Sequence, residues 1–270
     1  MICNKKILII SGNLIKHKYF VIYIVKRYQN CAVIFEKYPK DIRKNYTDNN
    51  SDIVKKHFQD VQQTDKKLLQ NKIQLNKKYI NKKTLLKINK GELNSRLCLS
   101  KINKFKPDLI VLCATSIIKG KLYKDYKGKI INFHAGLSQY FRGAGCNVWA
   151  IYYNKLDRIG ATIHFINRNI DSGNIITQGI PKITKNDNSH TIGIKVAKVG
   201  SKLVIKVIDH YLKNNKIPSS NQKNFKSIKL CKKKDFNEKI VLKINQLIVE
   251  GIVIKHLNLP KKIKLINNLE

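Results

Sequence analysis

The sequence predicts an α/β fold in which a mostly parallel sheet is covered by helices on both faces. An apolar run from Lys5 to Ile10 ends in the turn residues Ser11-Gly12-Asn13, and a helix-length segment follows from His17 to Tyr28. A second apolar run, Cys31 to Phe35, comes next. Strand, helix and strand within about thirty residues form a βαβ unit, which implies parallel strands and a right-handed crossover. Ligands bind beyond the carboxyl ends of such strands, so Ser11, Gly12 and Asn13 are predicted to bind substrate.

The rest of the chain continues this alternation. Strands are expected at 108–113, 130–134, 161–166 and 174–180, and helices at 117–123, 146–153, 190–213 and 240–249. After a polar, turn-rich segment at 39–52, apolar residues recur at largely helical spacing, which predicts one long amphipathic helix interrupted near Gly91. We therefore expect a domain at 1–185, with a helical insertion at about 50–100, and a small C-terminal helical extension at 186–270.

The charge of the chain is strongly positive. It has 54 basic and 17 acidic residues, a formal net charge of +37. Such an excess attracts polyanions, and nucleic acid is the obvious one. However, only six of the basic residues are arginine, which is the better residue for bidentate phosphate and base recognition, and the lysines are spread along the chain among isoleucine and asparagine. Lysine, isoleucine and asparagine all have AT-rich codons, so compositional drift is the favoured explanation of the positive charge.

The cysteines and apolar runs exclude two classes of protein. The six cysteines show no C-x-x-C or other metal-ligand spacing, so we expect free thiols and no metal. The longest apolar run, Tyr19 to Val25, falls far short of the roughly 20 residues that span a membrane. The first residues do not resemble a signal peptide. A cytoplasmic protein is expected, and the apolar stripe of the insertion is compatible with a homodimer.

The stretch from Lys129 to Ile176 carries the candidate chemistry. Asn132 and His134 are separated by one residue on a predicted strand, so their side chains project from the same face. A turn-rich segment, a helix and a second strand follow, and they end in Asp171-Ser172-Gly173. This connection returns a carboxylate to the end of the first strand. The sequence therefore predicts an amide, an imidazole and a carboxylate at one sheet edge.

These motifs resemble those of the folate-dependent formyltransferases, which act on methionyl-tRNA, glycinamide ribonucleotide and amino-sugar nucleotides. The resemblance rests on 132–137 (NFHAGL), Arg142-Gly143, 160–164 (GATIH) and 170–176 (IDSGNII), in the family's order and at nearly its spacing. It implies a Rossmann-like catalytic domain. One residue departs from the pattern, because Gln139 stands where many relatives have proline.

The resemblance implies that 10-formyltetrahydrofolate is the co-substrate. Formyl transfer to an amine passes through a tetrahedral carbon with a negative oxygen, and it requires a proton to leave the amine. Asn132 would donate to that oxygen, His134 would donate to it or carry the proton, and Asp171 would favour the charged imidazole and accept proton density. Further expected substrate-binding residues are Arg142, Gly143, Thr162 and His164.

The acceptor is expected to be a small anionic amine such as an amino-sugar nucleotide. The tRNA-acting members of the family carry a C-terminal barrel, and the residues after Lys213 show no convincing succession of strands. Three alternatives stay open. They are methionyl-tRNA formyltransferase, a hydrolase of formyltetrahydrofolate, and a basic RNA-binding protein that keeps the fold without catalysis.

Overall fold

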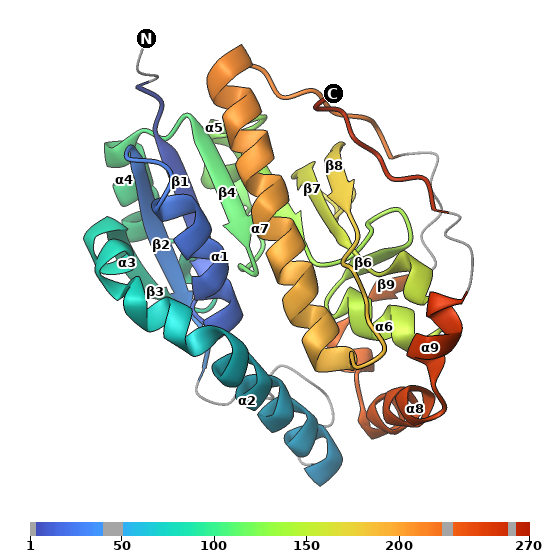
Figure 1. Ribbon diagram of the computed structural model, residues 1–270. Helices are drawn as coiled ribbons and strands as arrows, with labels where there is room; N and C mark the ends of the chain where they lie inside the picture. The colour runs from blue at the N-terminus through green and yellow to red at the C-terminus, as the bar shows by residue number, and fades with distance from the viewer. Residues whose placement is uncertain (1–3, 40–50, 223–228, 259–262) are drawn as a thin grey trace.

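The computed structural model describes residues 4–39, 51–222, 229–258 and 263–270, and it is built around a seven-stranded sheet (Figure 1). The strand order is β3-β2-β1-β4-β5-β7-β8. The first five strands run parallel, and β7 lies antiparallel to both β5 and β8. The strands are β1 (Ile7–Gly12), β2 (Cys31–Lys37), β3 (Thr84–Asn89), β4 (Leu109–Cys113), β5 (Ile130–His134), β7 (Ala161–Phe165) and β8 (Ile175–Gly179). The predicted mostly parallel α/β sheet is confirmed.

Helices cover both faces because the central strands are apolar on both sides. In β1, Ile7 and Ile9 belong to one hydrophobic core, whereas Leu8 and Ile10 belong to the other. The first core is covered by α1 (Ile15–Val25), α2 (Asp52–Leu75), α3 (Lys77–Lys83) and α7 (Ser189–Asn214). The second is covered by α4 (Arg96–Phe105) and α5 (Gly120–Asp125). In α7, Gly200 lies so close to Phe133 of β5 that a Cβ would meet the ring at 2.2 Å.

The insertion is helical, but the expectation of one long helix was wrong. Helices α2 and α3 are followed by strand β3, which pairs with β2 at the edge of the sheet. Its sequence, TLLKIN, is neither a continuous apolar run nor a strict alternation of apolar and polar residues, so no strand pattern stands out. Ile88 is buried in the second core while Leu85 is exposed. This burial of one face is what stabilises the segment as a strand. Most of the predicted polar segment 39–52 lies outside the described residues.

The amphipathic face of α2 is used within the chain. Val54, Leu69 and Ile73 are buried in the first core, and α2 contacts α1, α7 and α8. Leu68 and Leu75 remain exposed. A homodimer through this helix stays a prediction.

The C-terminal part of the chain packs on the sheet and around β5. Helix α7 contacts α1, β7 and β8, and α8 (Glu238–Val249) contacts α6 (Cys146–Tyr152). A short strand, β9 (Lys229–Cys231), pairs with β6 (Phe141–Gly143), and α9 (Ile252–Leu257) follows α8. Two tail segments also bond the free edge of β8, through Ser220 at Ile175 and Asn267 at Thr177. The division into domains at residue 185 stays a prediction.

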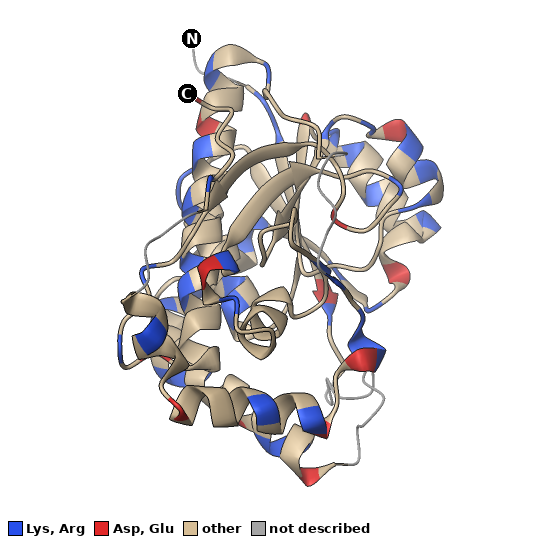
Figure 2. Cartoon of the chain, turned by 90° about the vertical axis from the view of Figure 1, so that its right-hand side faces the viewer, with Lys and Arg blue, Asp and Glu red and all other residues tan. Residues whose placement is uncertain are grey.

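The lysines and arginines are scattered over helices across the molecule (Figure 2). Among the described residues, no helix combines the length and apolar character needed to cross a membrane.

Candidate active site

Strand β5 places Asn132 and His134 beside β7. In the antiparallel register, Asn132 faces His164 and His134 faces Thr162. After β7 the chain turns back, and Asp171 takes a left-handed conformation with φ of 48°. Gly173 holds this turn against β7, because a Cβ there would lie 1.7 Å from the Phe165 carbonyl oxygen. The carboxylate is thereby returned to the end of β5.

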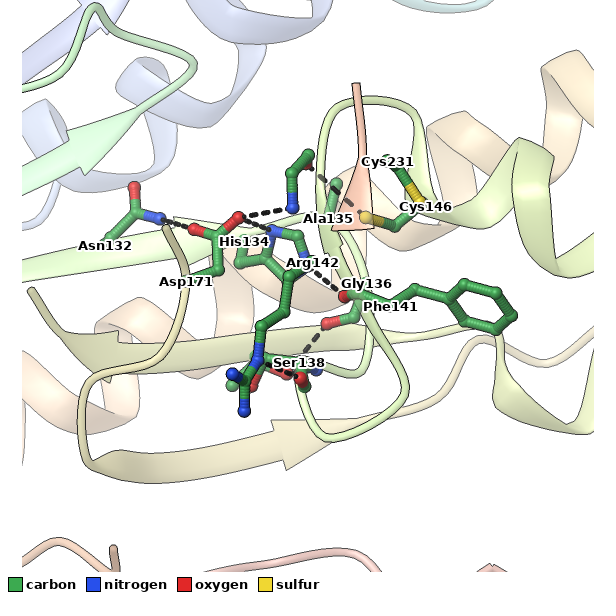
Figure 3. Close-up of polar contacts among 12 residues, drawn as sticks. Asn132, His134, Ala135, Gly136, Ser138, Phe141, Arg142, Cys146, Asp171 and Cys231 are labelled. Carbon is green, nitrogen blue, oxygen red and sulfur yellow. Dashed lines mark hydrogen bonds and ion pairs between the residues drawn. The ribbon is translucent and has the colours of Figure 1, made fainter. Parts of the chain in front are cut away.

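The three predicted catalytic residues meet (Figure 3). Asp171 Oδ2 lies 3.2 Å from His134 Nδ1, and Asp171 Oδ1 accepts a hydrogen bond of 3.2 Å from Asn132 Nδ2. The Gly143 N–H donates to Asp171 Oδ2 at 2.8 Å. His164 belongs to the same cluster, since its Nε2 lies 3.2 Å from Asn132 Nδ2 and 3.4 Å from Asp171 Oδ1. Its Nδ1 faces the Phe165 carbonyl oxygen at 2.7 Å, and the side chain is buried.

The His134 ring lies between two acceptors. Its Nε2 is 3.0 Å from the Phe141 carbonyl oxygen, opposite the Asp171 contact at Nδ1. A neutral imidazole has one N–H and can donate to only one of these oxygens, whereas an imidazolium donates to both. Burial lowers the pKa of His134, while the neighbouring carboxylate of Asp171 acts to raise it. Opposed influences of this kind suit a group that gains and loses a proton.

Asp171 is held in its charged form. Burial acts to raise the pKa of this carboxyl group, but the His134 and His164 imidazoles and the Gly143 N–H outweigh it and hold the pKa well below its ordinary value.

Two sulfur atoms lie nearby, those of Cys146 and Cys231 (Figure 3). Burial raises the pKa of the Cys146 thiol, so at neutral pH this group is not a thiolate nucleophile.

The loop after His134 is fixed by buried hydrogen bonds. The Thr162 hydroxyl donates to the Gly136 carbonyl at 2.7 Å and accepts from the Ser138 N–H at 3.2 Å. Gln139, the departure from the family pattern, is buried and donates to Gln178 Oε1 at 3.1 Å. Gln178 also donates to Thr162. Gln139 and Gln178 are therefore a pair of buried amides that helps to hold this loop.

Arg142 and Gly143 both contact other segments of the chain. Arg142 Nε donates to the Ser138 carbonyl at 2.9 Å, and its Nη2 donates to Gln222 Oε1 at 3.3 Å. Gly143 has a φ of 93°, and a Cβ there would lie 2.3 Å from the Cys231 carbonyl oxygen. The expected substrate-binding roles of Arg142, Gly143, Thr162 and His164 stay predictions.

Ser11, Gly12 and Asn13 lie at the same edge of the sheet, at the end of β1. Asn13 Oδ1 accepts from the Tyr38 N–H at 2.9 Å, and Ser11 is fully buried.

His17, in the first turn of α1, is a further residue near this turn and carries no sequence signal. Its Nδ1 is buried without a hydrogen-bond partner among the described residues, and a Cβ on Gly12 would lie 2.5 Å from it. The expected substrate-binding roles of Ser11, Gly12 and Asn13 also stay predictions.

Two features of the site have no sequence signal. Gln222 lies in a loop-like segment that carries no motif, and the Phe141 contact is made by a backbone carbonyl, which the residue type does not reveal. The described cysteines form no disulfide with one another. Among the described residues, no group of three or more His, Cys, Asp or Glu side chains is placed to hold a metal ion.

A family model described as formyl transferase matches residues 27–208, about two thirds of the chain. This chain belongs to the formyl transferase family. The methionyl-tRNA formyltransferase of Chlorobium chlorochromatii is 31% identical over 104 residues, which cover 38% of this chain and 33% of that protein. The matched segments of this and seven other curated relatives span 33–42% of their lengths.

Solved structures of formyltransferases share the fold. The phosphoribosylglycinamide formyltransferase of Anaplasma phagocytophilum superposes with a TM-score of 0.55 at 14% identity, covering 78% of this chain and 88% of that one. An N-formyltransferase of Helicobacter canadensis, described in complex with folinic acid and dTDP-3-aminofucose, gives a TM-score of 0.55 at 20% identity. That comparison covers 96% of this chain and 84% of the other. At these identities the likeness concerns the fold.

Proposed function

We propose that this formyl transferase family member moves the formyl group of 10-formyltetrahydrofolate to a primary amine. The observation that carries the proposal is the convergence of Asn132, His134 and Asp171, with Asp171 3.2 Å from each of the other two. An amide donor, an imidazole and a carboxylate in contact can serve one reacting carbon. The family match and the fold of the neighbours agree with this chemistry.

Each residue has a role in the balanced reaction. The acceptor nitrogen bonds to the formyl carbon, the bond from that carbon to N10 of the folate breaks, the amine loses a proton and N10 gains one. Asn132 Nδ2 donates to the formyl oxygen as its negative charge grows. His134 donates to the same oxygen and passes a proton towards N10. Asp171, held ionised, orients the imidazolium and accepts the proton that the amine loses, which passes to His134 once the ring has given its own proton to N10.

The side chains of this site must exchange partners when substrate binds. His134 Nε2 now faces the Phe141 carbonyl, and Asn132 Nδ2 is shared between Asp171 and His164. We expect the formyl oxygen to replace the Phe141 carbonyl at His134 and His164 at Asn132. The segment that carries Phe141 must therefore shift, because the side chain of His134 is only 5% exposed.

The acceptor we propose is a small anionic amine such as an amino-sugar nucleotide. Adjacent strands lie about 4.8 Å apart, so the ends of β1 and β5, separated by β4, are roughly 10 Å apart. That span suits a small molecule whose amine reaches Asp171 while its anionic part lies at Ser11-Gly12-Asn13. Lys16 and Lys90 lie close enough to this turn to lower the pKa of His17, but Lys90 is paired with Glu36 and Lys16 with Asp65, so an anionic group would have to compete with these carboxylates. The Helicobacter canadensis neighbour is described in complex with dTDP-3-aminofucose, an amino-sugar nucleotide of this kind.

Methionyl-tRNA is the second candidate acceptor. Curated relatives of about 30% identity carry the name methionyl-tRNA formyltransferase, and the net charge of +37 would favour a polyanion. Water is a third, since the Arabidopsis thaliana formyltetrahydrofolate deformylase 2 is 30% identical over 117 residues.

An assay of tetrahydrofolate release tests the proposal. The protein is incubated with 10-formyltetrahydrofolate and, in turn, a dTDP-amino sugar, glycinamide ribonucleotide, methionyl-tRNA or water alone, and mass spectrometry identifies the formylated product. We expect release with the amino sugar, and a loss of roughly 10²- to 10³-fold in Asn132→Ala. His134→Ala and Asp171→Asn should also lose activity. Asn169→Ala, on the exposed part of the same turn, is the matched control.

The same experiment separates the alternatives. Formylated methionyl-tRNA as the sole product would transfer the proposal to the second candidate, and release with water alone would favour hydrolysis. No release with any acceptor, together with tight salt-sensitive RNA binding that Asn132→Ala and His134→Ala leave unchanged, would show a binding protein instead.

A further inference from the structure

Gln222 joins the two loops that complete the candidate active site. It comes from the tail segment after α7, far along the chain from both loops, and is only 2% exposed. Its Oε1 accepts from the Ser138 hydroxyl at 3.1 Å and from Arg142 Nη2 at 3.3 Å. Its Nε2 donates to the Asp171 carbonyl at 3.1 Å and to the Gly173 carbonyl. All four hydrogen-bonding positions of this amide are therefore taken by the two loops.

The two loops meet at the carboxylate. The first loop holds Ser138 and leads into strand β6, where Arg142 lies and the Gly143 N–H donates to Asp171 Oδ2. The other loop is the turn that carries Asp171 in its left-handed conformation. If the loops separate, the Gly143 N–H loses the carboxylate, and the contact between Asp171 and His134 loses one of its supports. Backbone pairing of Ser220 with Ile175 fixes the tail segment two residues before Gln222.

We infer that Gln222 is a positioning residue that sets the geometry of Asp171 and His134 by clamping these two loops together. Its side chain contacts neither the His134 ring nor the Asp171 carboxylate in the bonds described above, so it acts through Gly143 and the Asp171 backbone. Its effect on turnover rests on the proposed formyl transfer, whereas its effect on the His134 ring does not.

Three variants test this role. Gln222→Leu keeps the volume and removes all four bonds. Gln222→Glu keeps the acceptor for Ser138 and Arg142 but loses the donor to Asp171 and Gly173. Ser220→Ala is the matched control, because it removes one side-chain bond, to Asn268, and leaves the backbone pairing of the tail intact. Thermal melting followed by circular dichroism shows which variants are folded.

Two measurements follow on the folded variants. In the formyl-transfer assay we expect Gln222→Leu and Gln222→Glu to lose kcat roughly 10-fold or more, with KM for both substrates little changed. The acid limb of the kcat profile should move to higher pH, because Asp171 loses a donor to its charged form. In histidine-labelled protein, the NMR signals of the His134 ring, assigned with His134→Ala, should shift in both variants and stay in place in Ser220→Ala.

The outcomes are distinct. Parent-like ring signals and an unchanged pH profile in Gln222→Leu would overturn the positioning role, and parent-like values in Gln222→Glu would show that the Asp171 side of the clamp is dispensable, which also contradicts it. A parent protein that formylates no acceptor would refute the proposed function alone, because the NMR comparison still tests Gln222.

Discussion

Gly136 shows how tightly the sequence around His134 is constrained. A Cβ at this position would lie 2.7 Å from His134 Nε2 and 2.7 Å from the Cβ of Cys146. Gly136→Ala must therefore displace the imidazole from the Phe141 carbonyl. We expect the formyl-transfer rate to fall by roughly 10²-fold, the effect of moving a reacting group by about 1 Å. Steady-state kinetics with a saturating acceptor measures the loss.

A second glycine provides the control for this substitution. Gly193 in α7 has open space around its Cβ position and an ordinary backbone conformation. Gly193→Ala should leave the rate unchanged and stabilise the helix by about 0.5–1 kcal/mol. Equal rates in Gly136→Ala and the parent would show that His134 tolerates displacement, which contradicts the proposed role of its ring.

At the scale of elements, α2 and α7 meet through two histidines. His57 Nδ1 lies 3.5 Å from His190 Nε2, and His57 also packs against Phe58 and Phe236. Burial lowers the pKa of His57 from 6.5 to about 4, assisted by the charge of His190. Below pH 6.5, His57 is protonated in the unfolded chain but stays neutral in the folded chain until the pH nears 4. The free energy of unfolding therefore decreases as the pH falls.

This junction predicts a pH dependence of stability. Between pH 7 and pH 5, His57 should reduce the free energy of unfolding by about 2 kcal/mol. Urea unfolding at the two pH values measures the change, which His57→Phe should diminish because the new ring cannot be protonated. Phe58→Leu weakens the same packing without removing a titrating group, so it should lower stability equally at both values. An undiminished pH change in His57→Phe would mean that other groups cause it.

The elements could be predicted from the sequence where one physical signal dominated. Strands β1 and β4 contain continuous apolar runs, and β5 begins with the apolar pair Ile130-Ile131. Asn132, His134 and Asp171 could be placed together because strand alternation and a returning turn bring them to one edge. Strand β3 was missed because TLLKIN is neither a continuous apolar run nor a strict alternation, and only tertiary burial of Ile88 defines it. Gln222 and His17 were missed because their importance lies in contacts between distant segments, which no local pattern encodes.

At the scale of the whole molecule, the positive charge must oppose compaction. The 17 acidic residues can neutralise at most 17 of the 54 basic ones, and Figure 2 shows the lysines and arginines distributed over the molecule. Several ion pairs, including Lys56 with Asp60 and Lys121 with Asp125, lie at the surface and contribute little. Repulsion among unpaired cations is therefore expected to exceed the attraction within pairs.

This balance predicts that salt stabilises the protein. Raising the ionic strength from about 10 mM to about 150 mM shortens the screening length from about 30 Å to about 8 Å, which weakens long-range repulsion more than contacts within ion pairs. Tm from differential scanning calorimetry should rise by several degrees over this range, equally in sodium and potassium chloride. Sucrose at matched osmolarity is the uncharged control and should change Tm less. A Tm that falls with salt would show that attractive pairs dominate, so the lysines would then be arranged for stability instead of scattered by composition.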